Sequence, residues 1–461
     1  MYLTTSTLNL FLAVFNVIWV VINFYNFSAL AVGEYTLYKS HRGKGQQPVQ
    51  PPSREERSNL PKISILLAAY HEMTVLPNNL RACLKLNYPR DRMELIVVTE
   101  EDDRGTRAAI RPFIKRYKFI RSVIVPKDSP YPRGKPRALD IGLLKAKGSI
   151  IGVLDAEDVV SPNLLQEVAQ KMTREDYDVV QGILDPVNDE SGWFSLMERA
   201  EYGYWYRHYL YALSLSGYPL PLGGTTNFIR KSVLDALGGW ETGNLTEDFE
   251  LGLKIYNTRK ISERAEPSYM SYGGVLSTYP GRRYVEMPRY KVGLLNSITK
   301  EEAPSTWQGW HRQRTRWQQG KLQTLENYAR NPPPGFLGKI HIFLFTMQPH
   351  IVFINLIGIS LSVAAVLTHD LLPLTLAILT YINFCGIVIY STMNAYGYLQ
   401  ASKDDNRKGR MGAAIFVGLS TPVYWIFQWI SDMRAAKREY VNNSTEWFKT
   451  EHTGPHMKRR A

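Results

Sequence analysis

Three groups of side chains in this chain of 461 residues have types and spacing that suit chemistry on phosphates and hydroxyl groups. The first is the decapeptide 311–320 (HRQRTRWQQG), which combines arginines with Trp317. Arginine offers forked hydrogen-bond donors that match phosphate oxygens, and a tryptophan face stacks on a sugar ring or a base. The decapeptide joins a polar part of the chain to an apolar part, so an alternative is a basic segment that holds anionic lipid headgroups.

The second group is a pair of carboxylates, Asp155 and Glu157, directly after the apolar run 150–154. In a strand, residues two apart point to the same side and lie about 7 Å apart. Two carboxylates at this separation suit a hard divalent cation, Mg²⁺ or Mn²⁺, that also bridges diphosphate oxygens. The alternative is a helix cap, since Ser161-Pro162 follow shortly afterwards.

The third group is Thr246-Glu247-Asp248, where Thr246 is typical of a helix N-cap and places Asp248 in the first helical turn. A carboxylate in that position can remove the proton of a hydroxyl group. The alternative is a charge that only complements the helix dipole. Lys135, before a predicted helix, can contact a phosphate, although a single lysine is more often solvated.

The elements that must position these side chains are predicted to form an α/β domain. Continuous apolar runs predict buried parallel strands, and helical segments lie between them. Ligands of such sheets bind at the carboxyl ends of the strands, where the acidic clusters 99–103 and 155–158 lie. The predicted strands are 63–69, 95–98, 122–125 and 150–154, and the predicted helices are 78–86, 104–117 and 135–147.

A glycine turn, 222–227 (LGGTTN), follows an aromatic-rich helical pattern over 193–213 whose rings we expect to serve mostly as packing. Gly224 and Thr225 lie where the backbone can approach a ligand. The strand, GxGxxG and helix arrangement is missing, so the turn is not predicted to bind a dinucleotide.

Apolar segments predict a multi-pass membrane protein. Residues 8–32 carry no charge and can cross a bilayer, and the basic residues after them place the next segment in the cytosol. An interfacial helix is predicted over 336–348. Three further spans would leave the basic tail outside, against the charge rule, unless one of them is interfacial or re-entrant. The predicted spans are 351–368, 371–396 and 413–430.

These features suggest a domain order and exclude some partners. We expect an anchor over 1–36, a Pro-rich linker over 37–60, a cytosolic domain over 61–330, membrane helices over 331–435 and a basic tail over 436–461. The net charge of +13 suits an anionic membrane or a phosphorylated substrate. No zinc finger, RNA-binding signature or basic helical face is visible, so nucleic acid is not an expected partner. The two cysteines fall in unlike regions and predict no disulfide.

One reaction needs all of these parts. Transfer of a sugar from a nucleotide diphosphate donor requires cations and a metal for the leaving group, and a base for the acceptor hydroxyl. The motifs resemble, in order, those of membrane-embedded family-two glycosyltransferases, the superfamily of cellulose, hyaluronan and chitin synthases. The matching segments are 61–72, 134–139, 155–158, 180–182, 223–227, 246–248, 301–304, 313–317 and 447–452.

This resemblance implies a GT-A type fold, inversion at the anomeric carbon and a set of site residues. Asp248 matches the catalytic base, and Asp155 and Glu157 match the metal ligands, although many members have Asp at the second position. The expected acceptor is a growing β-linked polysaccharide; alternatives are a single transfer to a lipid or glycolipid, or a non-catalytic scaffold. The positions expected to contact the nucleotide-sugar donor or the acceptor are Tyr70, Glu72, Asp103, Lys135, Gly224, Thr225, Glu247, Gln313, Arg316 and Trp317.

Overall fold

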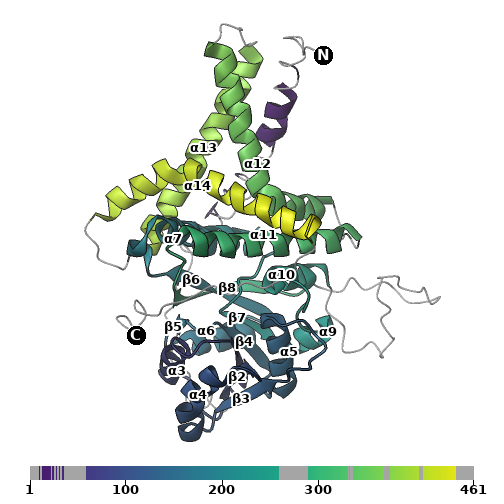
Figure 1. Ribbon diagram of the computed structural model, residues 1–461, viewed down its shortest axis with the longest axis vertical. Coiled ribbons are helices and arrows are strands. Elements are labelled where there is room, and N and C mark those ends of the chain that lie inside the picture. Colours follow the sequence, from purple (N-terminus) through teal and green to yellow (C-terminus); the bar gives the residue numbers. More distant parts are fainter. Residues whose placement is uncertain are drawn as a thin grey trace, which may run out of the picture.

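The computed structural model describes residues 10, 13–21, 23, 24, 27, 31, 34, 35, 59–216, 218–258, 289–330, 332, 336–367, 374–403 and 409–442. They form three tiers (Figure 1): an α/β domain, a layer of helices that crosses one end of it, and helices that stand upright on that layer. The predicted linker up to residue 58 and the tail beyond residue 442 lie outside the described residues, as does much of the predicted anchor.

One eight-stranded sheet forms the α/β domain, in the order β3-β2-β1-β4-β7-β6-β8-β5. The first four strands in this order are parallel to one another, β6 and β8 are parallel, and β7 is antiparallel to both β4 and β6. The mostly parallel sheet confirms the predicted fold class. The strands are β1 Ile63–Ala69, β2 Met93–Glu100, β3 Ile120–Val125, β4 Ile150–Leu154, β5 Val159–Val160, β6 Val179–Pro186, β7 Asn227–Arg230 and β8 Val292–Glu301.

Apolar side chains bury both faces of the central strands, which is why β1 and β2 read as continuous apolar runs. The helices between strands are α3 Leu76–Leu84, α4 Arg104–Arg116 and α5 Lys135–Lys145, close to their predicted bounds. Gly142 of α5 lets that helix lie against Leu66 and Val98, because a Cβ there would lie only 3.0 to 3.5 Å from their methyl groups. The short helices α6 Leu164–Ala169 and α9 Lys231–Leu237 complete the domain.

The crossing layer holds α7 Trp193–Tyr204, a π-helical turn Trp205–Tyr209, α8 Leu210–Ser216 and α11 Trp307–Arg330. Figure 1 shows α7 and α11 lying across the top of the sheet, with α14 Arg410–Tyr440 above α11. Aromatic rings from the three helices stack on one another, as the packing interpretation of 193–213 expects. These rings are Trp193, Phe194, Trp307, Trp310, Tyr424 and Phe427.

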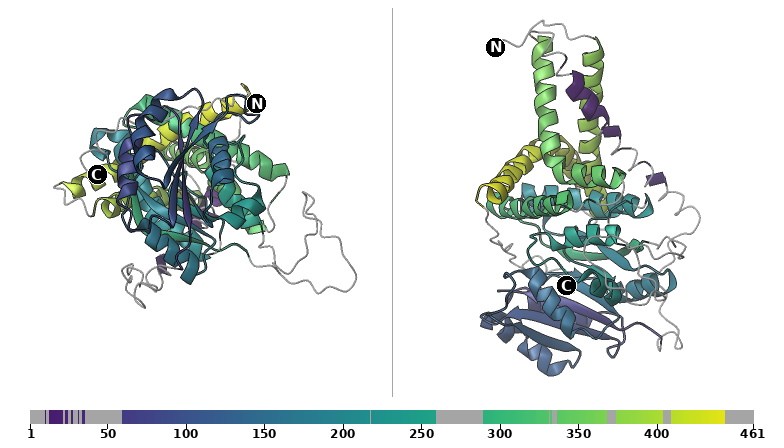
Figure 2. Two further views of the ribbon diagram at one scale, coloured as in Figure 1. Left: turned by 90° about the horizontal axis from the view of Figure 1, so that it is seen from below. Right: turned by 90° about the vertical axis from the view of Figure 1, so that its right-hand side faces the viewer.

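The upright tier contains α12 Phe336–Leu367 and α13 Leu374–Ala401, which rise side by side from the layer (Figure 2). The predicted interfacial helix 336–348 and most of the predicted span 351–368 fall within one continuous helix, α12. The α13 helix rests on α7 where Gly203 meets Gly397, since a Cβ on either glycine would overlap backbone atoms of the other helix. Asn383 of α13 donates to Asn16 Oδ1 at 2.5 Å and accepts from Asn23 at 3.5 Å, which fixes the N-terminal helical residues against α13.

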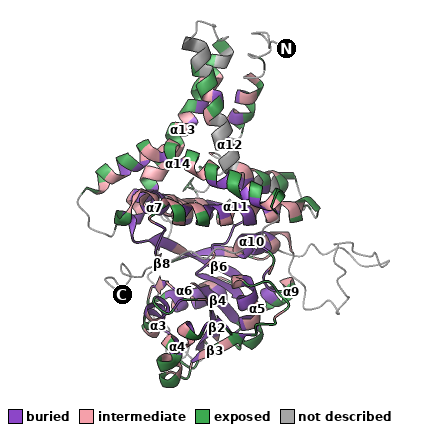
Figure 3. Ribbon diagram, in the orientation of Figure 1, coloured by how far each residue is buried: buried purple, intermediate pink, exposed green. Residues whose placement is uncertain are grey.

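Within the described part of the chain, two helical segments are long and apolar enough to cross a membrane, Ala377–Ala401 and Arg410–Tyr440. Only the first stands upright; α14 runs crosswise to it (Figures 1 and 2). One face of α14 is buried against the layer, and the other exposes apolar side chains to the outside (Figure 3). The exposed residues, spaced three or four apart, are Met411, Ile415, Leu419, Val423, Ile426, Ile430 and Met433.

Candidate functional site

A cavity of about 470 Å³ lies between the carboxyl ends of the strands and the helices above them. All of the predicted site residues except Asp103 line it. Its walls come from β1, β2, β4, the glycine turn, α7, α10 Glu247–Asn257 and α11, and from residues of α12, α13 and α14. The three groups that the sequence separates by up to 160 positions therefore meet in one space.

Lys135, the first residue of α5, connects the predicted metal-binding pair, Asp155 and Glu157, to the glycine turn 222–227. Its ammonium group pairs with the carboxylate of Asp155 and donates to the carbonyl oxygen of Gly224 at 2.6 Å. A Cβ at Gly224 would lie 3.2 Å from Oδ2 of Asp248, so only a residue without a side chain leaves the base position open. Four segments thus converge: the end of β4, the start of α5, the turn before β7 and the start of α10.

The turn after β4 is held by Asp158, which is fully buried. Its Oδ2 accepts from the backbone N–H of Asp155 at 2.8 Å and from the hydroxyl group of Thr225. Because α6 begins only at Leu164, with Asn163 as its cap residue, Asp155 and Glu157 are not helix caps. Their side chains remain partly exposed to the cavity, whereas the Thr225 hydroxyl is used to support the turn.

Asp248 lies in the first turn of α10, as predicted from the sequence. Thr246 occupies the cap position, but its hydroxyl group donates to Asn244 Oδ1 at 3.3 Å and makes no capping bond. Gly320 allows close packing here, because a Cβ at that position would overlap Thr246. Arg316, one turn earlier on α11, donates to the carbonyl oxygen of Leu245 at 3.3 Å, so α11 is fixed beside the start of α10.

Burial and charge shift the ionisation of this cluster. Burial raises the pKa of Glu247 to about 7, helped by the neighbouring charge of Asp248 and opposed by Lys135 and Arg316. Burial also raises the pKa of Asp248, again opposed by Lys135 and Arg316. Burial alone would lower the pKa of Lys135, but the surrounding carboxylates, led by Asp155, raise it. A base with a raised pKa works closer to neutral pH than an ordinary aspartate.

Carboxylates outnumber cations around the end of β4. Burial raises the pKa of Asp158, and the charges of Asp155 and Glu157 raise it further. The pKa of Glu301 is raised by burial and by the same acidic residues. Oxygen donors with excess negative charge fit a hard divalent cation. Among the described residues no group of three or more His, Cys, Asp or Glu has metal-binding geometry.

Trp317 presents its ring to the cavity from the middle of α11. The ring of Tyr202 stacks on it with centroids 6.4 Å apart, and the Arg314 guanidinium lies 4.6 Å from its centre. Arg314 is fixed by the buried carboxylate of Glu198 at 3.2 Å and by the partly exposed carboxylate of Glu201 at 2.8 Å. Trp317 is therefore held in a defined orientation, as a stacking residue requires.

Gln313 and Arg316 retain unused hydrogen-bonding atoms at the cavity wall. Within the part of the chain that the structure describes, Oε1 of Gln313 and Nε of Arg316 are buried without a hydrogen-bond partner. Such groups are rare in proteins unless a ligand or water satisfies them. Both residues come from the decapeptide, and both point to a ligand that is not part of the chain.

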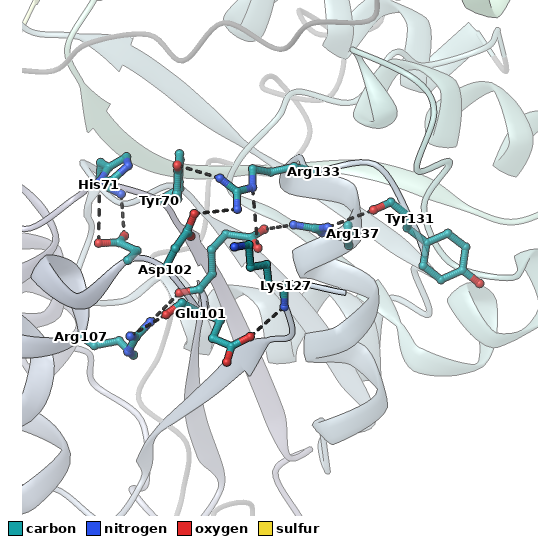
Figure 4. Close-up of polar contacts among 11 residues, drawn as sticks. Tyr70, His71, Glu101, Asp102, Arg107, Lys127, Tyr131, Arg133 and Arg137 are labelled. Carbon is teal, nitrogen blue, oxygen red and sulfur yellow. Dashed lines mark hydrogen bonds and ion pairs between the residues drawn. The ribbon is translucent and has the colours of Figure 1, made fainter. Parts of the chain in front are cut away.

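At the other end of the cavity, Arg133 connects the ends of β1 and β2 (Figure 4). It donates to the Tyr70 hydroxyl and to Asp102 at 2.8 Å each, and it lies over the Tyr70 ring at 5.0 Å. Glu100 is buried and pairs with Arg137 at 2.5 Å. Tyr70, Glu100 and Arg133 line this end of the same cavity, as does Glu72.

Asp103 lies away from the cavity, only 1% exposed. It caps α4 by accepting from the N–H of Thr106 at 3.0 Å, and it also accepts from the N–H of His71 at 2.6 Å. The neighbouring Asp102 pairs with Arg133, which lines the cavity. Adjacent acidic residues carry no sequence signal that distinguishes a cap from a ligand contact.

Sequence reasoning also missed Arg133, Glu100, Lys321 and Asp432, all of which line the cavity. For Arg133, the signal that could have identified it as a site residue is its position directly before the Gly134-Lys135 motif. Lys321 follows Trp317 by one helical turn, so it shares a face of α11. Nothing in the sequence linked Asp432, in a mostly apolar segment, to the polar site.

Comparison with known proteins places this geometry in context. Residues 61–320 match the family described as glycosyltransferase like family 2. The chain is 24% identical to beta-monoglucosyldiacylglycerol synthase from Synechocystis sp., over 85% of this chain and 75% of that protein. It is 27% identical to poly-beta-1,6-N-acetyl-D-glucosamine synthase from Staphylococcus epidermidis, over 44% and 48% of the two chains.

The fold is also similar to a solved structure, the mannosyltransferase PcManGT from Pyrobaculum calidifontis in complex with GDP-Man and Mn²⁺. The likeness has a TM-score of 0.52 at 18% identity and covers 87% of this chain and 99% of that one. At this identity it supports the fold alone. The sheet order and the helices around it are thus those of a known α/β architecture.

Proposed function

The chain belongs to the glycosyltransferase like family 2, and from this premise we propose that it transfers a sugar, with inversion, from a nucleotide diphosphate donor to a hydroxyl group of a membrane-borne acceptor. Family membership favours a UDP-sugar. One observation carries the proposal: Asp155, Asp248 and Trp317 line a single cavity that is acidic at the sheet and apolar at the upright helices. Such a cavity suits a polar donor and an amphiphilic acceptor.

The donor diphosphate would lie between Asp155, Lys135 and Arg316. Lys135 and Arg316 would stabilise the charge that develops on the departing diphosphate. Mg²⁺ or Mn²⁺, held by Asp155 and Glu157, would supply further charge compensation when bound. The nucleoside would reach toward Tyr70 and Glu72, where Arg133 supplies a flat cation next to an aromatic ring.

Asp248 would act as the general base. It would remove the proton of the acceptor hydroxyl as the oxygen attacks the anomeric carbon, on the face opposite the departing diphosphate, which inverts the configuration. The raised pKa makes Asp248 a stronger base, and the charges of Lys135 and Arg316 limit how far this pKa rises. Trp317 and Gln313 would orient the acceptor, and Gly224 leaves the approach to Asp248 open.

The acceptor would enter from the helical end of the cavity. Large apolar and aromatic side chains of α12, α13, α14 and the N-terminal helical segment line that end, and the outer faces of α13 and α14 are apolar and exposed. We place α12 and α13 across a bilayer and α14 flat in its cytosolic interface. This arrangement keeps the basic tail in the cytosol and removes the conflict in the sequence-based topology. The lining residues are Trp19, Leu344, Phe345, Tyr390, Met393 and Trp425.

A lipid or glycolipid acceptor is supported by the extent of the sequence similarity. The likeness to the glycolipid synthase covers most of this chain, whereas the likeness to the polysaccharide synthase covers less than half of it. Extension of a β-linked polysaccharide, the leading expectation from the sequence, is the second candidate. It rests on the stacking position of Trp317 and on the polysaccharide synthase among the relatives.

The test uses the full chain purified in detergent and a panel of nucleotide sugars with Mg²⁺ or Mn²⁺. We expect nucleotide release with one donor and a single glycolipid product when a diglyceride or a glycolipid is supplied. A ladder of products would favour the polysaccharide candidate. No turnover with any donor, or the same turnover in Asp248→Asn, would overturn the proposal.

A further inference from the structure

A second polar pair, Lys321 and Asp432, lies at the helical end of the cavity, outside the motifs already used. Lys321 follows Trp317 by four residues on α11, so both side chains share one helix face. Asp432 comes from α14 and follows Gln428 by four residues on the face that lines the same cavity. Two helices that are far apart in the sequence thus place an ammonium and a carboxylate beyond the stacking residue.

Asp432 is 3% exposed, and its Oδ2 atom is buried without a hydrogen-bond partner among the described residues. A buried carboxylate oxygen in that state is costly, and proteins usually satisfy such atoms. Because Asp432 lines the cavity, a ligand can supply the missing donor. Asp432 is therefore more than a packing residue of α14.

Lys321 lines the same cavity as Asp432 and the proposed base, Asp248. Its ammonium lies 4.6 Å from the centre of the Phe345 ring. Burial lowers the pKa of Lys321, and the charge of Asp432 is the largest influence that opposes this effect, with smaller ones from Glu201 and Asp248.

The pair matches one kind of ligand group. A carboxylate oxygen accepts hydrogen bonds and an ammonium donates them, whereas an alcohol oxygen does both. An ionised phosphate ester or an ester carbonyl only accepts, so it would leave Asp432 unsatisfied.

We propose that Asp432 and Lys321 bind a second hydroxyl group of the acceptor, next to the one that Asp248 deprotonates. The acceptor is then a lipid that already carries a sugar, such as a monoglycosylated diglyceride, and not a bare diglyceride or a polyprenyl phosphate. The sugar ring would stack on Trp317, between the carboxylates of Asp248 and Asp432. This inference rests on the proposed function and adds the chemical class of the acceptor.

The experiment compares acceptors in mixed micelles with the full chain and its active donor. The acceptors are monoglucosyl diglyceride, its monodeoxy derivatives, the bare diglyceride, undecaprenyl phosphate and the soluble sugar cellobiose. The variants are Asp432→Asn, which keeps the shape, and Lys321→Met. Arg434→Gln is the matched control, because Arg434 is an exposed charge on the same helix. Binding of UDP measured by calorimetry checks that each variant is folded.

For the natural chain we expect monoglucosyl diglyceride to be the best acceptor, with one deoxy derivative showing a KM on the order of 10-fold higher. In Asp432→Asn the KM for the complete glycolipid should rise by a similar factor. Removing the same hydroxyl group from the acceptor should then raise the KM of this variant no further. Arg434→Gln should behave like the natural chain.

Two results would overturn the inference and leave the proposed function intact. These are equal use of the bare diglyceride and a deoxy penalty that is unchanged in Asp432→Asn. Better use of undecaprenyl phosphate or cellobiose would overturn both the inference and the membrane-borne hydroxyl acceptor of the proposed function. Failure of sugar transfer itself looks different, because then no donor is turned over with any acceptor.

Discussion

The ammonium group of Lys135 pairs directly with the carboxylate of Asp155, twenty residues further along the chain. The same ammonium donates to the carbonyl of Gly224, whose missing side chain leaves room for Asp248. One cation therefore connects the proposed metal motif, the glycine turn and the proposed base. This connection preorganises the acidic residues at the site of charge transfer before substrate binds.

The metal assignment predicts how Asp155→Ala behaves. Loss of one carboxylate should remove the gain in donor affinity that Mn²⁺ or Mg²⁺ provides, because one of the two protein ligands is gone. Calorimetric titration with UDP, with and without the metal, measures this directly. If the variant keeps the full metal-dependent gain, Asp155 is not a ligand.

The base assignment predicts that Asp248→Asn reduces transfer by a factor on the order of 10³, within the usual range for a lost general base. Nucleotide affinity should stay nearly the same, since the proposed donor contacts lie on Lys135 and Arg316. Single-turnover rates and UDP titrations separate the two effects. A large loss of UDP affinity would show that Asp248 serves the donor instead.

Trp317→Ala should harm use of the acceptor more than hydrolysis of the donor, because the ring would stack on the acceptor sugar. We expect a higher acceptor KM in Trp317→Ala and partial recovery in Trp317→Phe, which retains a flat ring. The two rates are followed by nucleotide release with and without acceptor. The reverse pattern would count against stacking.

Arg316→Gln should move the acid limb of the pH profile of kcat/KM to higher pH. The guanidinium lowers the pKa values of Glu247 and Asp248, so its removal raises both, and the base becomes protonated at a higher pH. Arg312→Gln, on an exposed position of the same helix, is the control and should leave the limb in place.

Arg314→Met should destabilise the protein by about 3–5 kcal/mol, because it leaves the buried carboxylate of Glu198 without its cation, while the partly exposed Glu201 loses the same partner. Thermal unfolding in detergent measures the loss. A second variant that combines Arg314→Met with Glu201→Gln should regain part of the stability, since one unpaired charge is removed. Equal stability of the natural chain and Arg314→Met would show that the ion pairs are dispensable.

Local patterns in the sequence were sufficient for much of the α/β domain. Continuous apolar runs predicted β1 and β4, because strands buried on both faces need apolar side chains at every position. Asp155 and Glu157 follow a strand directly, and Asp248 follows a cap residue, so their places depend on neighbours only a few residues away. The resemblance to a family then related these separate motifs to one another.

Tertiary contacts decided the rest, because a sequence pattern does not specify which distant segments meet. Asp102 and Asp103 are alike in sequence, yet packing against His71 and Thr106 makes the second a helix cap. Hydropathy marks α14 as a possible span but not its direction, which contacts with α7 and α11 determine: the Tyr424 ring packs against Trp310, and its hydroxyl group donates to Glu201. Only when α14 lies across α11 does Asp432 enter the cavity that also holds Lys321, since side chains from two separate helices can share a site only after the helices pack.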